Sequence, residues 1–379
     1  MPLPRADSQE RRGAPFKGVR RWLQRLLRYV RRLLSLMLKG AGEFLTLGIE
    51  TSCDDTALAV LEGEHHVLAD AISSQIDSHS VYGGVVPELA SRMHQEAILP
   101  LLECVLKKAG VNDPRGEIDL IAVTAGPGLM GSLLVGVMTA KALAQGWGVP
   151  LLGVNHLEGH IFANAAAAED LKPPFISLIV SGGHTEVVLV REFGDYELLG
   201  STRDDAAGEA YDKVSKVLGL GYPGGPVIDR LAAKGDARAF TLPMPLANTK
   251  EIEFSFSGLK TAAITLIDKE RKEGGTFPLE DICASFQRAV VDSLLTKIKL
   301  AVNRTGVKTL TVSGGVAANS ALRAALQDYA DSHGVALYLP PRGMCTDNAV
   351  MVAAAGRCAY ARGERSDLSL SPDPSWSIW

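Results

Sequence analysis

The feature that most constrains the fold is a pattern of strand, polar turn and strand that occurs twice. In the first copy, the apolar residues 44–50 and 57–61 enclose a turn of hydroxyl and carboxylate side chains, Thr51-Ser52-Cys53-Asp54-Asp55-Thr56. In the second, residues 175–180 and 186–190 enclose Ser181-Gly182-Gly183-His184-Thr185. Two such hairpins, about 130 residues apart, predict a duplicated α/β domain whose polar turns face each other across a cleft. Turns of this kind can hold the phosphates of a nucleotide from both sides.

Length and cysteine content agree with a duplicated intracellular domain. The chain has 379 residues, of which 46% are hydrophobic, and this is long enough for two domains or one doubled domain. Its five cysteines are scattered, with no C-x-x-C spacing. We therefore expect neither a disulfide framework nor a zinc knuckle, and a reducing, cytoplasmic location is the default.

Charge is distributed unevenly. Residues 11–40 carry ten lysines and arginines and no acid, yet the whole chain has a net charge of −4, so the rest of the chain is acidic. An acidic body does not attract nucleic acid by bulk charge, so a local basic patch, the amino-terminal arm or a partner would have to do so. Arg92, Lys141 and Lys260 are candidates for such a patch.

The arm itself predicts a basic amphipathic helix. In residues 18–38, apolar side chains recur at spacings of three and four while arginines fill most of the gaps, which excludes a membrane span. Three interpretations stay open: a membrane-surface or RNA-contacting arm, a transit peptide that would make the protein mitochondrial, or an extension upstream of a start at Met37. We treat residues 1–43 as an extension outside the core.

A histidine pair suggests a metal site. His156 and His160 follow the short strand predicted at residues 149–154 and begin an alanine-rich segment predicted to be helical. Four residues apart on a helix, the two imidazoles project from one face, as two ligands of one metal ion usually do. The order H-x-E-x-H puts Glu158 on another face, which argues against a metalloprotease. The alternative is a solvated or hydrogen-bonded pair without metal.

A third ligand candidate lies near the other end of the chain. Asp347 precedes the last predicted helix, which continues through Arg362, and either Thr346 or Asp347 could instead cap that helix. Two histidines and one carboxylate form a facial set with open positions for substrate.

Two glycine turns also follow predicted strands. The turn Gly126-Pro127-Gly128 could either bind a phosphate or only make a tight turn, and the turn Gly314-Gly315, with Asn319, could hold an adenosine.

Eight motifs, taken together and in order, resemble one family. They are Gly48-Ile49-Glu50-Thr51-Ser52-Cys53-Asp54-Asp55-Thr56, Tyr82-Gly83-Gly84-Val85-Val86-Pro87-Glu88, His156-x-Glu158-x-His160, Val180-Ser181-Gly182-Gly183-His184-Thr185, Asp204-Asp205-Ala206-Ala207-Gly208-Glu209, Phe254-Ser255-Phe256-Ser257-Gly258-Leu259-Lys260, Ser313-Gly314-Gly315-Val316 and Cys345-Thr346-Asp347-Asn348. Over residues 44–362 the chain resembles the tRNA N6-adenosine threonylcarbamoyltransferase family, once labelled as sialoglycoprotein endopeptidases. Ile179 stands where the archaeal and eukaryotic branch has a tyrosine, so the bacterial branch fits better.

The resemblance implies a duplicated actin/hexokinase-like α/β fold with two lobes around a nucleotide cleft. The lobes would span residues 44–170 and residues 171–362, the second with a helical insertion, and residues 363–379 would be a tail. One metal ion, iron first and zinc as the alternative, would be held by His156, His160 and Asp347. The remaining site residues would hold threonylcarbamoyl-AMP: Ile179, Val180, Ser181, Gly182, Gly183, Asp212, Gly225, Asp229 and Asn319.

The implied reaction is transfer of the threonylcarbamoyl group to the N6 amine of a tRNA adenosine beside the anticodon, with release of AMP. Asp54 or Asp55 would accept the amine proton, or would instead order waters of the metal. The family works with a paralogous inactive partner and a small ATPase. The alternatives are a small-molecule kinase or ATPase of the same fold, which gives no reason for the histidine pair, a metallo-glycopeptidase, and a non-catalytic scaffold.

Overall fold

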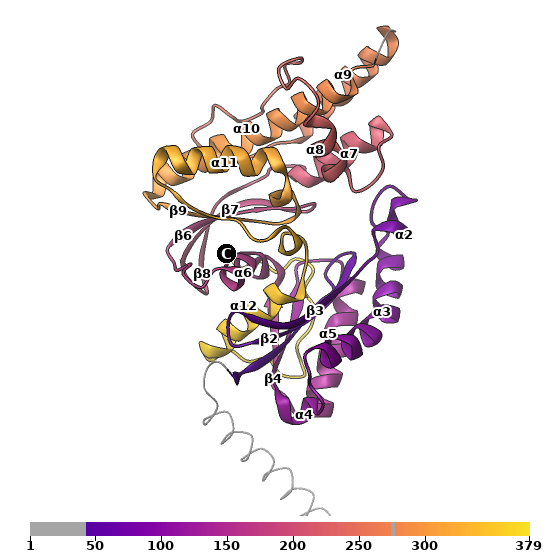
Figure 1. Ribbon diagram of the computed structural model, residues 1–379, viewed down its shortest axis with the longest axis vertical. Helices are drawn as coiled ribbons and strands as arrows, with labels where there is room; N and C mark the ends of the chain where they lie inside the picture. The colour runs from indigo at the N-terminus through magenta and orange to yellow at the C-terminus, as the bar shows by residue number, and fades with distance from the viewer. Residues whose placement is uncertain (1–42, 274–276) are drawn as a thin grey trace, which may run out of the picture. The chain divides into compact units, whose positions relative to one another are not determined.

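Two mixed sheets with the same strand order form the frame of the structure (Figure 1). The computed structural model describes residues 43–273 and 277–379, so the predicted basic helix at residues 18–38 lies outside the described residues. The first sheet has the order β3-β2-β1-β4-β5. The second, read from its β8 edge, has the corresponding order β8-β7-β6-β9-β10. Their strands are β1 Leu45–Glu50, β2 Asp55–Glu62, β3 His66–Ser74, β4 Ile118–Gly126, β5 Leu151–Asn155, β6 Phe175–Val180, β7 Thr185–Glu192, β8 Asp195–Ser201, β9 Thr309–Ser313 and β10 Ala336–Tyr338.

The strands of the two sheets are also connected in the same way. In each, the first three strands form an antiparallel meander, and the fourth and fifth strands return parallel to the first after helical crossovers. The predicted duplication is therefore confirmed. The third strand of the second meander, β8, was not predicted from the sequence.

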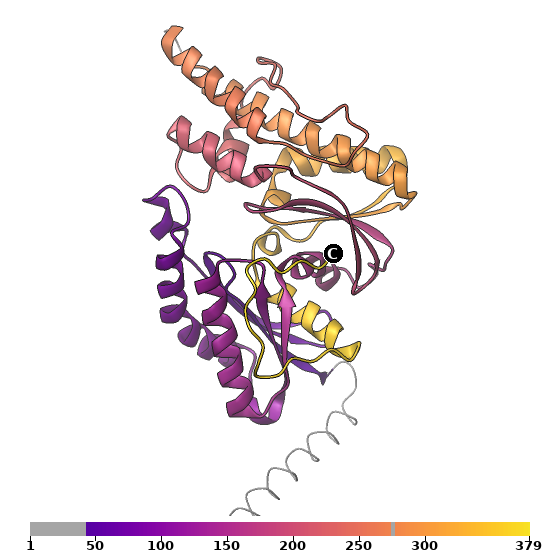
Figure 2. The same cartoon turned by 180° about the vertical axis from the view of Figure 1, so that it is seen from behind.

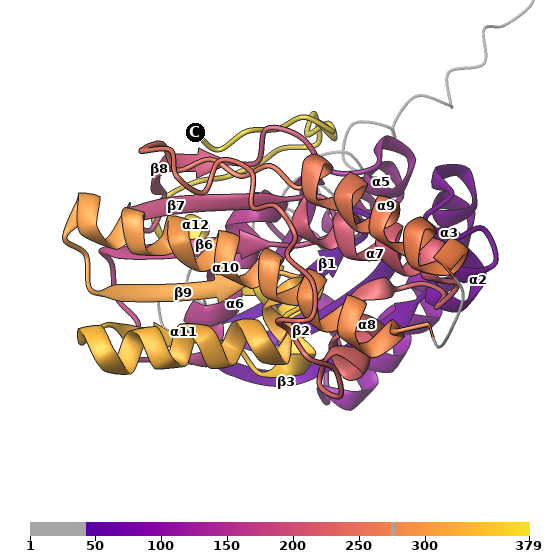
Figure 3. The same cartoon turned by 90° about the horizontal axis from the view of Figure 1, so that it is seen from above.

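Helices cover the outer faces of both sheets. The helices are α2 Ile76–Ser80, α3 Pro87–Lys108, α4 Pro114–Glu117, α5 Met130–Trp147, α6 His156–Ala167, α7 Ala207–Leu218, α8 Gly224–Ala232, α9 Ser257–Glu273, α10 Leu279–Thr305, α11 Ser320–His333 and α12 Ala349–Ala361. α3 and α5 pack on the first sheet, while α7 to α11 enclose the core on the outer side of the second. Figure 3 shows α10 and α11 side by side along the second sheet. None of the helices in the described residues is both long and apolar enough to cross a membrane.

α6 and α12 form the layer between the sheets. α12 contacts β1, β2 and β4 of the first sheet, α6 contacts β6 and β9 of the second, and the two helices pack on each other. One buried core joins Ala57 and Val154 of the first sheet with Phe175 and Ile179 of the second through these helices. The lobe boundaries predicted near residues 170 and 362 stay a prediction.

The carboxyl-terminal tail packs on the first sheet, which belongs to the first half of the duplicated fold. Residues 366–376 run beside β4 and β5, as Figure 2 shows for the yellow end of the chain. Asp373 donates its N–H to the carbonyl of Ala125, and a Cβ on Gly126 would lie 1.9 Å from the carbonyl oxygen of Asp373. The turn Gly126-Pro127-Gly128 is thus filled by the tail, which supports the tight-turn interpretation over the phosphate-binding one.

The close approach of α12 to the first sheet depends on glycine. A Cβ on Gly48 of β1 would lie 2.2 Å from the carbonyl oxygen of Ala349, and one on Gly356 of α12 would lie 2.4 Å from the Cβ of Ala122. Neither neighbour can turn away, because a backbone oxygen and a Cβ move only with their elements. The contact therefore leaves no room for a side chain at either position.

We predict that Gly356→Ala destabilises the protein by about 1–3 kcal/mol, because the added methyl group pushes α12 away from β4. Urea unfolding measures this change. The matched control is Gly146→Ala, also in a helix, where a Cβ would meet nothing within 4 Å. That variant should be neutral or more stable by up to about 1 kcal/mol. Equal stability of the two variants would contradict the packing argument.

Candidate functional site

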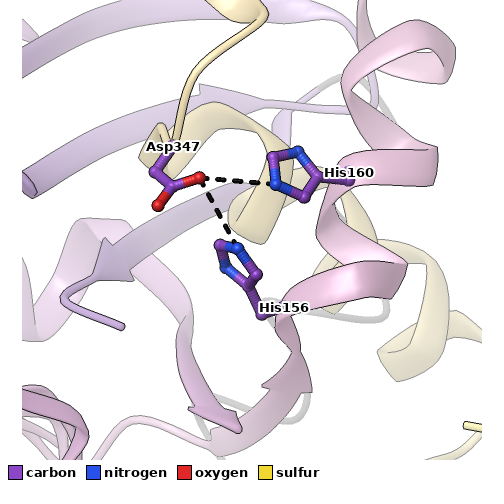
Figure 4. Close-up of side chains that lie close together, drawn as sticks. All are labelled: His156, His160 and Asp347. Carbon is purple, nitrogen blue, oxygen red and sulfur yellow. Dashed lines mark ion pairs between the residues drawn. The ribbon is translucent and has the colours of Figure 1, made fainter. Parts of the chain in front are cut away.

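The three predicted metal ligands meet at the amino-terminal ends of α6 and α12 (Figure 4). Oδ1 of Asp347 lies 3.5 Å from Nε2 of His156 and 3.4 Å from Nε2 of His160. Ligand atoms each about 2.1 Å from one ion in a tetrahedral arrangement are about 3.4 Å apart. Both distances from Asp347 therefore match a single metal ion, and all three ligand atoms lie within 4.8 Å of one another.

Asp347 is free to face the histidines because another residue caps α12. The amino-terminal cap is Asn348, whose Oδ1 accepts a hydrogen bond of 3.0 Å from the backbone N–H of Met351. The alternative in which Thr346 or Asp347 caps this helix is wrong. A carboxylate just outside a helix amino terminus is favoured by the helix dipole, and this helps to hold Asp347 in its ionised form.

His160 provides the strongest sign that the cluster is incomplete without a cation. The side chain is fully buried, and neither Nδ1 nor Nε2 has a hydrogen-bond partner among the described residues. A buried polar atom without a partner is costly, and native structures rarely keep one without a purpose. A metal ion would satisfy Nε2, the nitrogen that faces Asp347, so the donor set fits a metal that prefers imidazole and carboxylate.

His156 is held by residues that the sequence analysis did not single out. Its Nδ1 lies 3.2 Å from Oε2 of Glu50 and 3.1 Å from Oγ of Ser52. Thr124 donates from its hydroxyl to the same Glu50 oxygen, at 2.6 Å. Glu50 is fully buried at the end of β1. A carboxylate that ends an apolar strand was the sequence signal that could have identified it.

Charge in the buried cluster is strongly coupled. Burial lowers the pKa of His156, but the carboxylates of Asp347 and Glu50 outweigh this effect and raise it to about 9. Burial raises the pKa of Glu50 and Asp347, but His156 in particular outweighs it, and both pKa values fall below their ordinary range. The cluster therefore requires positive charge, supplied either by a proton on His156 or by a bound cation.

His184 lies at the edge of the cluster. Its ring centroid is 6.5 Å from that of His156. Burial, together with His156 and His160, lowers the pKa of His184 to about 4, so its ring is neutral at neutral pH. Because it belongs to the second polar turn, it brings that turn close to the histidine pair.

α6 is also anchored at both ends. Asn155 caps the helix by accepting from the backbone N–H of Leu157 at 2.9 Å, and its Nδ2 donates to the carbonyl of Trp376 in the tail at 2.9 Å. Asn164, two turns further on, donates to the carbonyl of Val312 in β9 at 3.0 Å. The helix that carries both histidines is thus fixed to the tail and to the second sheet.

Glu158 points away from the histidine pair, as predicted. Its carboxylate accepts a hydrogen bond of 2.7 Å from the hydroxyl of Tyr196 and pairs with Arg362. Both partners lie outside the metal cluster. The carboxylate is therefore not placed to act as the general base of a metalloprotease.

Asp54 and Asp55 lie in the first polar turn, near the charges of the cluster. Burial raises the pKa of both, to about 7 for Asp55, and the neighbouring Asp347 adds to the effect. The hydroxyl of Tyr222, between α7 and α8, donates to Oδ2 of Asp54 at 3.5 Å. The first turn therefore reaches elements of the second half, as two facing turns require.

The second polar turn offers open backbone. Ser181 accepts at its hydroxyl from the N–H of His184, while a Cβ on Gly182 or Gly183 would meet nothing within 4 Å. Ile179 and Val180 are fully buried in the two cores, so only their backbone can contact a ligand. The turn has room for a group to approach its main chain.

The remaining predicted substrate residues belong to α7, α8 and the start of α11. Oδ1 of Asp212 accepts from the N–H of Gly224 at 2.7 Å, beside Gly225, where a Cβ would meet nothing within 4 Å. Asp229 accepts from the hydroxyl and N–H of Ser320. Asn319 caps α11 and donates to Gln287 at 2.7 Å. These bonds connect α7 to α8, α8 to the start of α11, and α11 to α10.

Two of the three cations predicted as nucleic-acid contacts already have acidic partners. Arg92 pairs with Glu88 at 2.7 Å, and Lys260 pairs with Asp205. Pairing does not exclude a contact with phosphate, but it reduces the charge that each offers. Lys141 of α5 remains a candidate.

Comparison with known proteins identifies close relatives. The family model described as "TsaD: tRNA N6-adenosine threonylcarbamoyltransferase" matches residues 66–354. Proteins of that name from Dictyoglomus turgidum and Clostridioides difficile are 50% and 49% identical to the chain. The alignments cover 87% and 89% of this chain and 98% and 99% of the relatives.

The fold has wider relatives. HypF of T. kodakarensis, at 18% identity, superposes with a TM-score of 0.56 over 85% of this chain and 48% of its own. At this identity the likeness concerns the fold alone. With the repeated strand order, it confirms the predicted duplicated actin/hexokinase-like fold.

The charge coupling at His156 predicts how the stability of the metal-free protein depends on pH. The folded-state pKa of about 9 exceeds the ordinary value of 6.5, so the stabilisation is fully present below pH 6.5 and is lost as the pH rises through 9. The loss is at most about 3 kcal/mol. Urea unfolding after chelator treatment, from pH 6 to about 9.5, measures it. His156→Gln should remove this part of the dependence, and an identical profile would contradict the coupling.

Proposed function

The chain belongs to the tRNA N6-adenosine threonylcarbamoyltransferase family, and we propose which of its residues carry out the reaction of that family. In this reaction the threonylcarbamoyl group moves from threonylcarbamoyl-AMP to the N6 amine of a tRNA adenosine next to the anticodon, and AMP is released. The observation that carries the proposal is the cluster of buried His156 and His160 with half-buried Asp347 beside the two polar turns.

The cluster would hold one divalent or trivalent metal ion. Two imidazoles and one carboxylate suit iron, which we propose first, and also zinc, which is the alternative. When bound, such an ion supplies Lewis acidity that polarises a carbonyl group. His160, whose ring nitrogens make no hydrogen bond among the described residues, and the carboxylates of Glu50 and Asp347 beside His156 support this assignment.

The adenylate would lie against the second half. Gly182 and Gly183 present open backbone, which suits a phosphate group, and Ser181 orders their turn. Ile179 and Val180 would contribute main-chain groups only. The group formed by Asp212, Gly225, Asp229 and Asn319 would then surround the adenosine, where carboxylates accept from ribose hydroxyls.

The amine proton would pass to a carboxylate of the first turn. As the N6 nitrogen forms its bond to the carbamoyl carbon, the bond from that carbon to the phosphate oxygen breaks, and AMP leaves with the electron pair. Asp55, whose pKa of about 7 suits a general base at neutral pH, or its neighbour Asp54, would accept the proton. Ordering of metal-bound water is the alternative role for these residues.

The rival functions are not favoured. Phosphoryl transfer by a small-molecule kinase gives no role to the paired histidines. A metallo-glycopeptidase would need a base beside the metal, and Glu158 is engaged by Tyr196 and Arg362. The named relatives are transferases. Because those relatives are bacterial, we also propose a cytoplasmic location.

Partner proteins are part of the proposal. We expect tRNA and threonylcarbamoyl-AMP as substrates, a paralogous inactive partner and a small ATPase. Met130, Leu134 and Met138 form one face of α5, and Leu99 lies on the adjoining α3; each is 46–56% exposed. Exposed apolar side chains gathered in this way are typical of protein interfaces, and this stripe supports α3 and α5 as the surface for the paralogous partner.

We predict that the wild-type protein, given threonylcarbamoyl-AMP, tRNA and the partner proteins, forms threonylcarbamoyladenosine, and that His156→Ala lowers its yield at least 100-fold. Mass spectrometry of the tRNA nucleosides measures the product. Equal product from both proteins would keep the assignment as a transferase and reject a role for the metal. Absence of product from both, with ATP turnover on a small substrate, would favour the kinase.

A separate prediction concerns the apolar stripe. Leu134→Glu should weaken the complex with the paralogous partner at least 10-fold, because a carboxylate would be buried in an apolar interface. Gel filtration and calorimetry measure the complex. Ala324→Glu, on the exposed face of α11, adds the same charge elsewhere and should leave binding unchanged. Equal binding by both variants would place the interface on another surface.

A further inference from the structure

We infer that Glu50 is a positioning residue for the metal centre, which fixes the proton of His156 on Nδ1 and so presents Nε2 to the ion. The inference rests on the proposed metal site, and it assigns a role to a side chain outside the ligand set. It starts from the three hydrogen-bonding contacts that Glu50 makes.

Each oxygen of Glu50 is engaged. Oε1 accepts from the backbone N–H of Ser52 at 2.5 Å, and Oε2 accepts from the hydroxyl of Thr124 at 2.6 Å. Oε2 also faces Nδ1 of His156 at 3.2 Å. The carboxylate belongs to the fully buried end of β1, and Thr124 belongs to the adjacent strand β4, so its orientation is fixed by two elements of the sheet.

This arrangement determines which nitrogen of His156 carries the proton. An ionised carboxylate can only accept hydrogen bonds, so the ring nitrogen that faces it must be the donor. Ser52 also lies near Nδ1, at 3.1 Å, but its hydroxyl can rotate to accept as well as donate. With Nδ1 protonated, the lone pair of the neutral ring is at Nε2, the atom that faces Asp347.

The carboxylate also affects how strongly the imidazole can bind. A metal-binding histidine that donates its other N–H to a carboxylate is oriented and made more basic, and loss of such a partner typically costs 10–100-fold in metal affinity. His160 has no such partner among the described residues. The two histidines would thus differ, with His156 as the oriented ligand.

Glu50→Gln tests the inference in the full chain, because it keeps the shape of the side chain and removes its charge. We expect a loss of about 10–100-fold in Zn²⁺ affinity, measured by competition with a fluorescent chelator. In the Zn²⁺-loaded protein labelled with ¹⁵N-histidine, the Nδ1–H proton of His156 should move upfield and exchange faster with water. A purely structural role for Glu50 would not move this signal.

The control is Thr46→Val, on the same strand. Thr46 is fully buried, and its hydroxyl has no hydrogen-bond partner among the described residues. The substitution should leave both readouts unchanged. If Glu50→Gln does not fold, as judged by circular dichroism, Thr124→Val removes only one bond to the carboxylate and should weaken Zn²⁺ binding several-fold, with the same direction of change in the proton signal.

The outcomes separate this inference from the proposed function. If the wild-type protein binds no Zn²⁺ at the cluster, the metal site itself fails. If the wild type binds and the folded Glu50→Gln variant matches it in affinity and proton signal, the metal site stands and the role of Glu50 is overturned. When only Thr124→Val folds, unchanged affinity and proton signal in that variant overturn the role of Glu50 as well.

Discussion

The candidate site depends on the packing of α6 against α12 between the two sheets. His156 and His160 belong to one helix, and Asp347 precedes the capping residue of the other, so the ligands meet only if the helices start side by side. Gly48 and Gly356 let α12 lie close to the first sheet, and a Cβ on Gly159 of α6 would lie only 3.3 Å from Cγ of Met351 in α12. A packing constraint in the core therefore sets the distances in the site.

The charges of the cluster explain why this geometry would bind a cation. The cluster places the buried carboxylate of Glu50 and the half-buried carboxylate of Asp347 beside His156, and negative charge withdrawn from water must be compensated. A proton on His156 supplies one positive charge and stabilises the metal-free protein until the pH rises through about 9. A divalent cation would supply two and would also bind Nε2 of His160, which makes no hydrogen bond among the described residues. The same features that cost stability without a metal would thus favour its binding.

Sequence reasoning was most successful where the signal was local. The i, i+4 spacing placed both histidines on one helix face and excluded Glu158, because helical periodicity alone decides such directions. It was weaker where a choice depended on distant residues. Whether Asp347 or Asn348 caps α12 could not be decided from the residue types, since both are good caps. Strand β8 and the packing of the tail beside Gly126 also depend on partners far along the chain.

The sequence by itself determined the duplicated α/β fold, the family and the three ligand candidates, because repeated patterns and ordered motifs are properties of the chain alone. Only the tertiary structure decided that Glu50 and Thr124 support His156 and that the tail anchors Asn155. The physical reason is that these contacts join residues more than 70 positions apart, and no local pattern encodes which distant groups will be buried together.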